Sequence, residues 1–222
     1  IHTNPNKRHL TMAKAVGFNW VRLHDPGLQY IGWKYLEKKK GEWTFFDDKI
    51  KRYRAFNLKI LGELGTAPCW ASYQSKTSRK DKDGYSDKFF QPLDMRDYAN
   101  YVRVVSERYK NIISAWDVWN EPWMASWWAV DYDDKYVTSQ HPGDDYARLM
   151  KIAYESAKHV DPALNILGFN SSATAKTSKD IFSGSDWTSM IEAAGGLKWC
   201  DTLCYHTYPH GEVGYPGDSV CR

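Results

Sequence analysis

Several features that would assign the chain to a specialised class are missing from its sequence. No run of about 18 or more apolar residues is present, so no membrane-spanning helix is expected. The opening segment IHTNPNKRHL has neither the apolar stretch nor the small-residue cleavage site of a signal peptide. The 30 basic residues barely exceed the 27 acidic ones, which gives no reason to expect nucleic acid or a membrane surface as a partner. The default expectation is a soluble globular protein.

Cysteine is scarce and cofactor motifs are absent. Cys69, Cys200, Cys204 and Cys221 lack the paired CxxC spacing of a zinc site, and four cysteines are too few for a disulfide framework in a chain of this size. Free thiols are therefore expected, with a disulfide as the alternative. No phosphate loop and no glycine-rich dinucleotide motif occurs. We expect neither a cofactor nor a bound metal.

Aromatic residues, by contrast, are abundant, with 11 Trp, 15 Tyr and 8 Phe among 222 residues. Their rings pack well in a core, but they also present flat apolar faces to a ligand. Two interpretations follow from the composition. One is an enlarged core, and the other is a groove whose rings stack on the apolar faces of sugars.

Short β-rich segments alternate with helical patterns along the chain. The predicted strands cover 18–25, 58–64, 113–121, 165–172 and 200–208. The predicted helices cover 6–16, 49–58, 95–110, 143–160 and 185–196, with Asp47 or Asp48 capping the second and Asp94 capping the third. This alternation indicates an α/β fold with a parallel sheet, and the long spacing of the units favours a (β/α)8 TIM barrel over a compact doubly wound sheet.

Polar side chains follow the apolar part of each predicted strand. Because chemistry in a parallel α/β fold collects at the carboxyl ends of strands, we expect these side chains to converge on one concave face. They are Arg22, His24, Asp25, Glu63, Asn120, Glu121, Asn170, His206 and Tyr208.

The predicted barrel is incomplete. The sequence ends at residue 222, shortly after the predicted strand 200–208, whereas each further βα unit needs roughly 30 residues. If residues 1–5 are the tail of a first strand, the sequence accounts for strands one to six. We therefore expect residues 1–222 to form a single barrel domain that is truncated at its C-terminal side.

Glu121 is the strongest candidate for a catalytic residue. It lies within the run SAWDVWNEPW (114–123), in which three tryptophans surround a strand-like segment and a turn at Asn120, Glu121 and Pro122. A carboxyl group beside aromatic rings is poorly solvated when charged, so we expect its pKa to rise and keep it available as a general acid. The alternative is a salt-bridged structural glutamate.

The motif WDVWNEPW resembles the fourth-strand motif of the clan A retaining glycoside hydrolases. The likeness extends to GFNWVRLHD as a second-strand segment, to GEWTFFDDKIKRYRAFNLKILGELGTAPCWAS as the next helix and third strand, and to CDTLCYHTYP as a sixth strand. Family 39, or a relative near families 5 and 10, is the nearest placement. The resemblance implies a (β/α)8 enzyme that cleaves β-glycosidic bonds in a poly- or oligosaccharide. It also favours, on resemblance alone, a secreted or periplasmic location.

Carried over residue by residue, the resemblance assigns roles to several positions. Glu121 would be the acid/base, and Asn120 would donate to the 2-hydroxyl of the sugar being cleaved. Arg22 would support the nucleophile, with a structural ion pair as its alternative, and His206 would line the pocket, with a core histidine as its alternative. Tyr208 would line the same pocket as His206. Apart from the resemblance, the positions at strand ends and in the following loops make His24, Glu63, Trp70 and Trp123 candidate substrate contacts, with Trp127 and Trp128 as further platforms. For each of these tryptophans the alternative is a place in the core of a loop.

The clan pattern is interrupted at the nucleophile. Retaining hydrolysis needs a second carboxylate about 5 to 5.5 Å from the acid/base, and in this clan it ends strand seven. Neither Glu63 nor Glu212 matches that position, so we expect the nucleophile outside this sequence.

Two alternatives to a retaining glycoside hydrolase therefore remain. One is a catalytically inactive carbohydrate-binding barrel. The other is a metal-dependent hydrolase that uses His206 and His210, which straddle Pro209. The sequence makes no prediction of oligomeric state.

Overall fold

The computed structural model describes residues 1–76, 90–132, 135–173, 176–178 and 181–207. Helices and strands alternate along it as the sequence predicts. Their order is α1 (Lys7–Ala15), β1 (Trp20–Arg22), α2 (Trp33–Leu36), α3 (Asp47–Ala55), β2 (Lys59–Leu64), α4 (Met95–Arg108), β3 (Ala115–Val118), β4 (Asp131–Tyr132), β5 (Tyr136–Val137), α5 (Pro142–Val160), β6 (Asn165–Ser172), α6 (Gly184–Ala193) and β7 (Thr202–His206).

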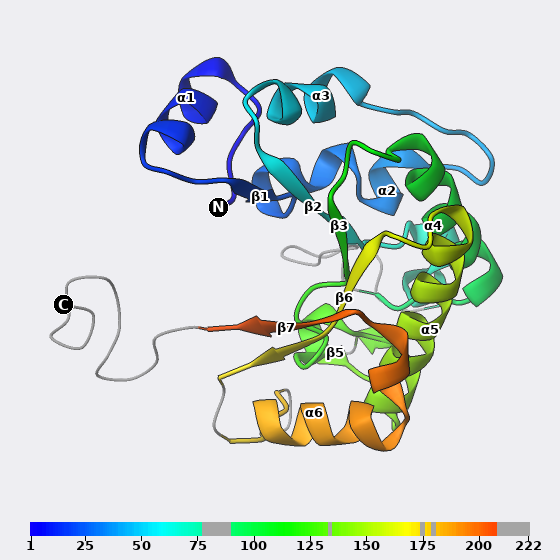
Figure 1. The fold of residues 1–222 in the computed structure, drawn as a ribbon. Coiled ribbons are helices and arrows are strands. Elements are labelled where there is room, and N and C mark those ends of the chain that lie inside the picture. Colours follow the sequence, from blue (N-terminus) through cyan, green and yellow to red (C-terminus); the bar gives the residue numbers. More distant parts are fainter. Residues whose placement is uncertain (77–89, 133–134, 174–175, 179–180, 208–222) are drawn as a thin grey trace, which may run out of the picture.

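One parallel sheet organises the molecule. Its strand order is β1-β2-β3-β6-β7, and each neighbouring pair is parallel. Figure 1 shows this sheet curling, with α3, α4, α5 and α6 along its outer side. The small strands β4 and β5 form a separate antiparallel hairpin in the connection between β3 and α5. The predicted α/β class and the five predicted strands are confirmed, and the sheet is part of a (β/α)8 barrel.

The expected first strand is represented by residue 1, whose backbone bonds to β1. The Ile1 carbonyl accepts a hydrogen bond from the Arg22 amide at 3.0 Å, and the Ile1 ammonium lies 3.4 Å from the Trp20 carbonyl. These two bonds flank Val21, which is the pattern of a parallel ladder. Residue 1 therefore pairs with β1 as a neighbouring parallel strand would, although no strand is assigned there.

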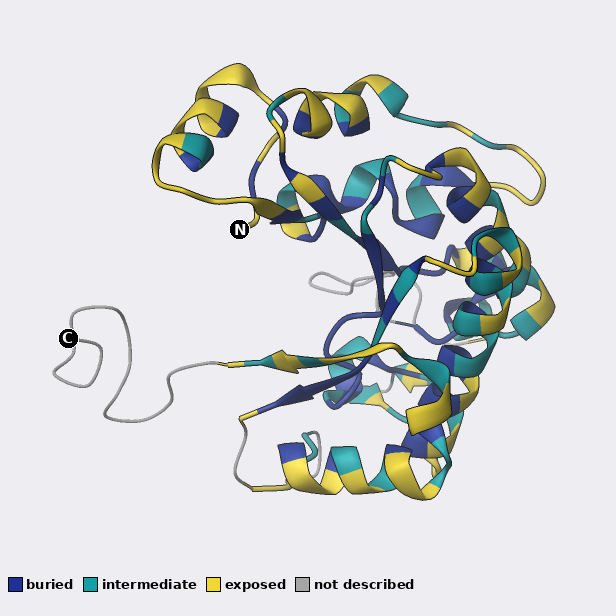
Figure 2. Cartoon of the chain, viewed as in Figure 1, coloured by how far each residue is buried: buried dark blue, intermediate teal, exposed yellow. Residues whose placement is uncertain are grey.

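The core lies between the outer face of the sheet and the helices. All four residues of β3 are buried, as expected for a central parallel strand covered on both faces. Figure 2 shows β3, β6 and the sheet-facing sides of the helices as mainly buried, whereas the edge strand β7 and the outer sides of the helices are largely exposed. Gly62 in β2 leaves room for the buried ring of Trp116, since a Cβ at that position would lie 2.4 Å from the ring. Many of the aromatic rings in the described ranges belong to this core or pack against it.

The helix starts agree only in part with the sequence. Asp94 caps α4, and its carboxylate accepts from the Arg96 amide at 2.8 Å. The prediction for α3 was wrong, because the N-cap is Phe46 and both Asp47 and Asp48 already lie in the first turn. There they still stabilise the positive end of the helix dipole.

The two edge strands expose large apolar side chains. Trp20 in β1 is 41% exposed, and Leu203 and Tyr205 in β7 are 58% and 56% exposed. Side chains of this type are normally covered in a closed barrel, whereas they face solvent at the edge of an open sheet. None of the helices within the described ranges is long and apolar enough to cross a membrane.

Candidate active site

The candidate site lies at the carboxyl ends of the parallel strands. Arg22 ends β1, Glu63 lies near the end of β2, Asn120 and Glu121 follow β3, and His206 ends β7. A hydrogen bond or an ion pair joins each of these side chains to at least one other member of the group. The structure therefore brings together five residues that lie as far as 184 positions apart in the sequence.

A buried charge centre forms the base of the site. Arg22 Nε donates to Asp117 Oδ2 at 2.9 Å, and Arg22 Nη2 lies 2.7 Å from the same oxygen. Arg22 Nη2 also lies 3.7 Å from Glu63 Oε2. Burial opposes the charge on Arg22, but Asp117 and Glu63 outweigh this effect and raise the pKa of the guanidinium. One guanidinium thus contacts two carboxylates that are almost completely buried.

The same arginine fixes the amide of Asn120. Arg22 Nη2 donates to Asn120 Oδ1 at 3.0 Å, which assigns the oxygen of the amide to the arginine side. Asn120 itself is 3% exposed. Its Nδ2 group consequently lies on the side of the amide that does not contact Arg22.

Glu121 sits beside Asn120 in a strained turn. Its φ is 47° and that of Trp119 is 70°, both in the left-handed region that non-glycine residues rarely adopt. Strain of this kind persists only where the surrounding structure enforces it, and it is concentrated at functional sites. Glu121 is 8% exposed, and its Oε1 lies 3.0 Å from His206 Nδ1. A carboxyl group is thus held at the rim by a specific partner.

His24 forms a second histidine–carboxylate pair. His24 Nδ1 lies 2.6 Å from Glu63 Oε2, and both side chains are buried. The ring of Trp127 approaches the imidazole with centroids 5.6 Å apart. Glu63 therefore contacts both Arg22 and His24, and His24 in turn packs against the ring of Trp127.

A β-bulge places Asn170 against the charge centre. The register of β6 against β7 shifts between Gly168 and Ser171, and Phe169 and Asn170 both have positive φ. Bulges of this type redirect a side chain. Here the Asn170 amide donates to Asp117 Oδ1 at 2.7 Å, so both oxygens of Asp117 are held.

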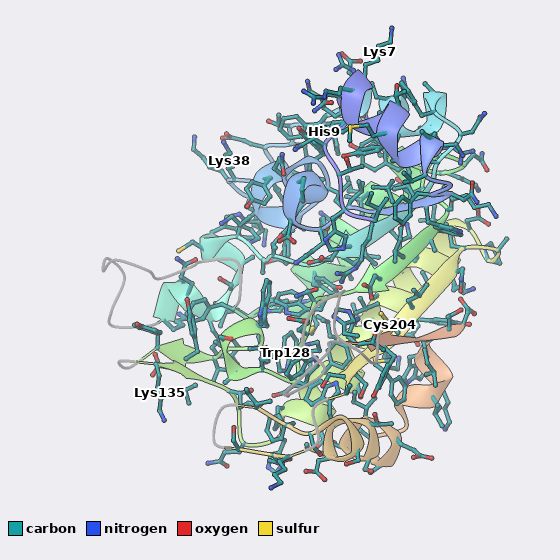
Figure 3. All side chains as sticks on the ribbon, turned by 90° about the vertical axis from the view of Figure 1, so that its left-hand side faces the viewer. Lys7, His9, Lys38, Trp128, Lys135 and Cys204 are labelled. Carbon is teal, nitrogen blue, oxygen red and sulfur yellow. The ribbon has the colours of Figure 1, made fainter. Side chains whose placement is uncertain are left out.

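Three potential metal ligands also meet in the site. One oxygen of Asp117, the sulfur of Cys204 and one ring nitrogen of His206 lie within 4.8 Å of one another. Burial raises the pKa of the Cys204 thiol, and Asp117 raises it further, so the thiol is protonated near neutral pH. Cys204 is labelled beside β7 in Figure 3, which shows the molecule from the side facing left in Figure 1.

The candidate tryptophan platforms differ in exposure. Trp123 is 4% exposed and Trp128 is fully buried, so the geometry does not support sugar stacking on either ring. Trp70 is half-buried, its Nε1 donates to the Glu37 carbonyl at 3.0 Å, and the Lys40 ammonium lies 5.4 Å from its ring. Trp127 is half-buried and contacts His24, which places it at the site.

Three residues considered from the sequence, Tyr208, His210 and Glu212, fall outside the described residues. Among the described residues, Cys69, Cys200 and Cys204 are free thiols, as expected, and Cys221 lies outside these residues.

Comparison with known proteins identifies the family of the chain. The model described as "Glycosyl hydrolase family 10" matches residues 30–184, which is more than half of the sequence. The chain belongs to glycosyl hydrolase family 10. The matched range contains Glu63, Asn120 and Glu121, and the predicted membership of clan A is confirmed. No curated protein sequence matches the chain.

Solved structures from families 10 and 39 share the fold of this family 10 chain. A family 39 glycoside hydrolase from Bacteroides cellulosilyticus WH2 is similar with a TM-score of 0.63 and 18% identity over 98% of the chain. Xylanase 10B from Thermotoga petrophila RKU-1 gives a TM-score of 0.55 and 15% identity over 91% of the chain. A monomeric β-xylosidase from Caulobacter crescentus CB15 gives 0.57 and 17% over 90%. The family 10 chain spans 40%, 55% and 38% of these three solved chains.

Asp117 and Cys204 are functional candidates that the sequence did not identify. A signal for Asp117 was present, since it is a charged residue inside an otherwise apolar strand and precedes the rim by only three positions. Cys204 shares the alternation of β7 with His206, two residues later. Neither sequence pattern shows which face of the strand points to the site.

Proposed function

We propose that this family 10 chain carries the acid/base side of a retaining β-glycosidase site that acts on xylan-type β-glycosides, with Glu121 as the acid/base. One observation carries the proposal. Glu121 is almost buried at the rim of the parallel sheet, bonded to His206, and directly follows an asparagine whose amide is oriented by Arg22. Its position within the family 10 match and the xylanase and β-xylosidase among the similar structures support the substrate class.

The geometry gives each side chain a step in the reaction. Glu121 donates its proton to the glycosidic oxygen as the bond to the sugar breaks, and it then accepts a proton from the attacking water. His206, 3.0 Å away, holds the carboxyl in place during both steps. Asn120 donates from Nδ2 to a sugar hydroxyl, since its Oδ1 is engaged by Arg22.

The nucleophile is expected on a strand that follows β7 in the barrel. A retaining mechanism requires a second carboxylate that is able to bond to the sugar. Glu63 and Asp117 lie in the site, but Glu63 is paired with His24 and Arg22, and Asp117 is bonded to Arg22 and Asn170. Both are therefore assigned to positioning rather than to attack.

Replacing Glu121 by Gln tests the acid/base role. The experiment uses the gene product that contains residues 1–222, with xylan and an activated aryl xyloside as substrates. Hydrolysis of xylan is expected to fall by roughly two to four orders of magnitude, because Gln keeps the shape but donates no acidic proton. The aryl xyloside is expected to lose less in the first step, since its leaving group needs little protonation.

The matched control is Glu42→Gln, an exposed glutamate whose replacement should leave both rates unchanged. NMR of the first-formed product anomer tests retention separately. Unchanged xylan turnover by Glu121→Gln would show that another carboxylate is the acid.

A carbohydrate-binding role without turnover is the second candidate for residues 1–222 by themselves. It is favoured because both other carboxylates in the described site, Glu63 and Asp117, are held by ion pairs. Binding of xylo-oligosaccharides to residues 1–222 should then be detectable by calorimetry, while hydrolysis is not. Turnover by residues 1–222 would place the nucleophile inside this sequence and refute its assignment to a following strand.

A further inference from the structure

We propose that Asp117, Cys204 and His206 form a binding site for a zinc-like divalent ion within the carbohydrate site. One carboxylate oxygen, one sulfur and one imidazole nitrogen lie within 4.8 Å of one another. Oxygen, sulfur and nitrogen from these three residue types are the ligands that Zn²⁺ takes in proteins, and three protein ligands leave the fourth position of a tetrahedral ion open.

The site is built on rigid strands. Cys204 and His206 are two residues apart on β7, so both side chains point to the same face. Asp117 comes from β3, and both β3 and β7 pair with β6. The ligands therefore meet across one strand, and their separation is fixed by backbone hydrogen bonds.

The distances are close to those of a filled site. Ligand atoms on a tetrahedral Zn²⁺ lie roughly 3.4 to 3.7 Å apart, given Zn–ligand bonds of about 2.0 to 2.3 Å. The three atoms here lie within 4.8 Å. Side-chain movements on the order of 1 Å thus bring them to bonding distance of one ion.

Asp117 retains capacity to bind an ion despite its hydrogen bonds. An ionised carboxylate offers about four lone-pair sites. Two Arg22 contacts fall on Oδ2, and Asn170 donates to Oδ1, so about one lone pair remains on Oδ1. The positive charge of Arg22 is also compensated by the carboxylate of Glu63, which lies 3.7 Å away. The guanidinium is therefore not an isolated positive charge beside the ion.

The sulfur ligand determines which ions are selected. Cys204 binds as a thiolate, and its thiol proton passes to solvent when the metal–sulfur bond forms. A thiolate favours Zn²⁺, Co²⁺ and Cd²⁺ over Mg²⁺ and Ca²⁺, which prefer all-oxygen sites. Binding is therefore expected for the first group of ions and not for the second.

Binding would also block the carbohydrate chemistry, a consequence that rests on the proposed function. His206 Nδ1 lies 3.0 Å from Glu121 Oε1, so an ion on the imidazole either removes this partner or places positive charge beside the acid. The expected effect is inhibition of hydrolysis by zinc, reversed by a chelator. Metal binding itself requires no turnover, and its test is independent of the proposed function.

The test uses Co²⁺ as a spectroscopic probe and a protein in which Cys204 is the sole cysteine, with Cys69, Cys200 and Cys221 replaced by serine. We expect a sulfur-to-cobalt charge-transfer band at one ion per chain, displaced by Zn²⁺ and unaffected by excess Mg²⁺. Adding Cys204→Ser should abolish the band. His206→Gln should weaken Co²⁺ binding by at least about tenfold.

Circular dichroism of each variant shows whether it is folded, and Glu42→Gln serves as a matched surface control. A band that survives Cys204→Ser, or no band in the folded sole-cysteine protein, would overturn the site. Binding unaffected by His206→Gln would show that the imidazole is not a ligand and would equally contradict the proposal. Normal Co²⁺ binding with inactive Glu121 variants would leave the site intact while deciding the hydrolase question separately.

Discussion

Replacing Arg22 by methionine removes a guanidinium that contacts two buried carboxylates. Asp117 is fully buried and Glu63 is 1% exposed, so neither carboxylate can recover its hydration when the arginine is lost. Methionine has a comparable length and fills the space without a charge. The perturbation therefore tests the electrostatic role of Arg22 rather than its packing.

The expected loss of stability is large. Breaking a buried ion pair by removing one partner costs about 3–5 kcal/mol, because an uncompensated charge remains in the interior. This is a large share of the roughly 5–15 kcal/mol by which folded domains are stable. Arg22→Lys should cost less, since the charge is kept, but an ammonium cannot reproduce the contacts to Asp117 and Asn120 together.

Urea unfolding followed by tryptophan fluorescence measures these differences. Arg103→Met is the matched control, because Arg103 forms an exposed helical pair with Glu107 and should lose at most about 0.5 kcal/mol. Adding Asp117→Asn to Arg22→Met should recover about 1–3 kcal/mol by removing the stranded charge. A loss for Arg22→Met equal to that for Arg103→Met would refute the buried charge centre.

Two further predictions concern thiol reactivity and ligand contact. Cys69 is exposed, whereas burial raises the pKa of the Cys204 thiol. Alkylation followed by peptide mass spectrometry should therefore label Cys69 first and leave Cys204 largely unmodified until the chain unfolds. Equal rates of labelling at the two thiols would contradict the described burial. Trp127→Ala should weaken xylo-oligosaccharide binding by about 1 kcal/mol, or roughly fivefold, through loss of an aromatic face. The control is Trp20→Ala, because Trp20 begins β1 and Arg22, at the other end of this strand, belongs to the site. An equal effect of both changes would exclude a sugar platform at Trp127.

The sequence determined the order of elements and the edge on which the site lies. Alternation of apolar strands and amphipathic helices depends on local periodicity, so the five parallel strands and the helices between them were predictable. Polar residues at strand ends were equally visible, and parallel strands bring such ends to one rim. The Asn120-Glu121-Pro122 turn accordingly lies just after β3, where the sequence predicts it.

The tertiary structure alone decided which side chains meet. The contact of Glu121 with His206, and that of Arg22 with Asp117, join residues 85 and 95 positions apart, and they depend on how far the sheet curls. The bulge that turns Asn170 toward Asp117 carries no periodic signal.

Exposure of the tryptophans was decided in the same way. Trp123 and Trp127 lie in one aromatic loop, and nothing local distinguishes them. Packing against the rest of the fold buries the first and leaves the second beside His24, because burial depends on segments that lie far away along the sequence.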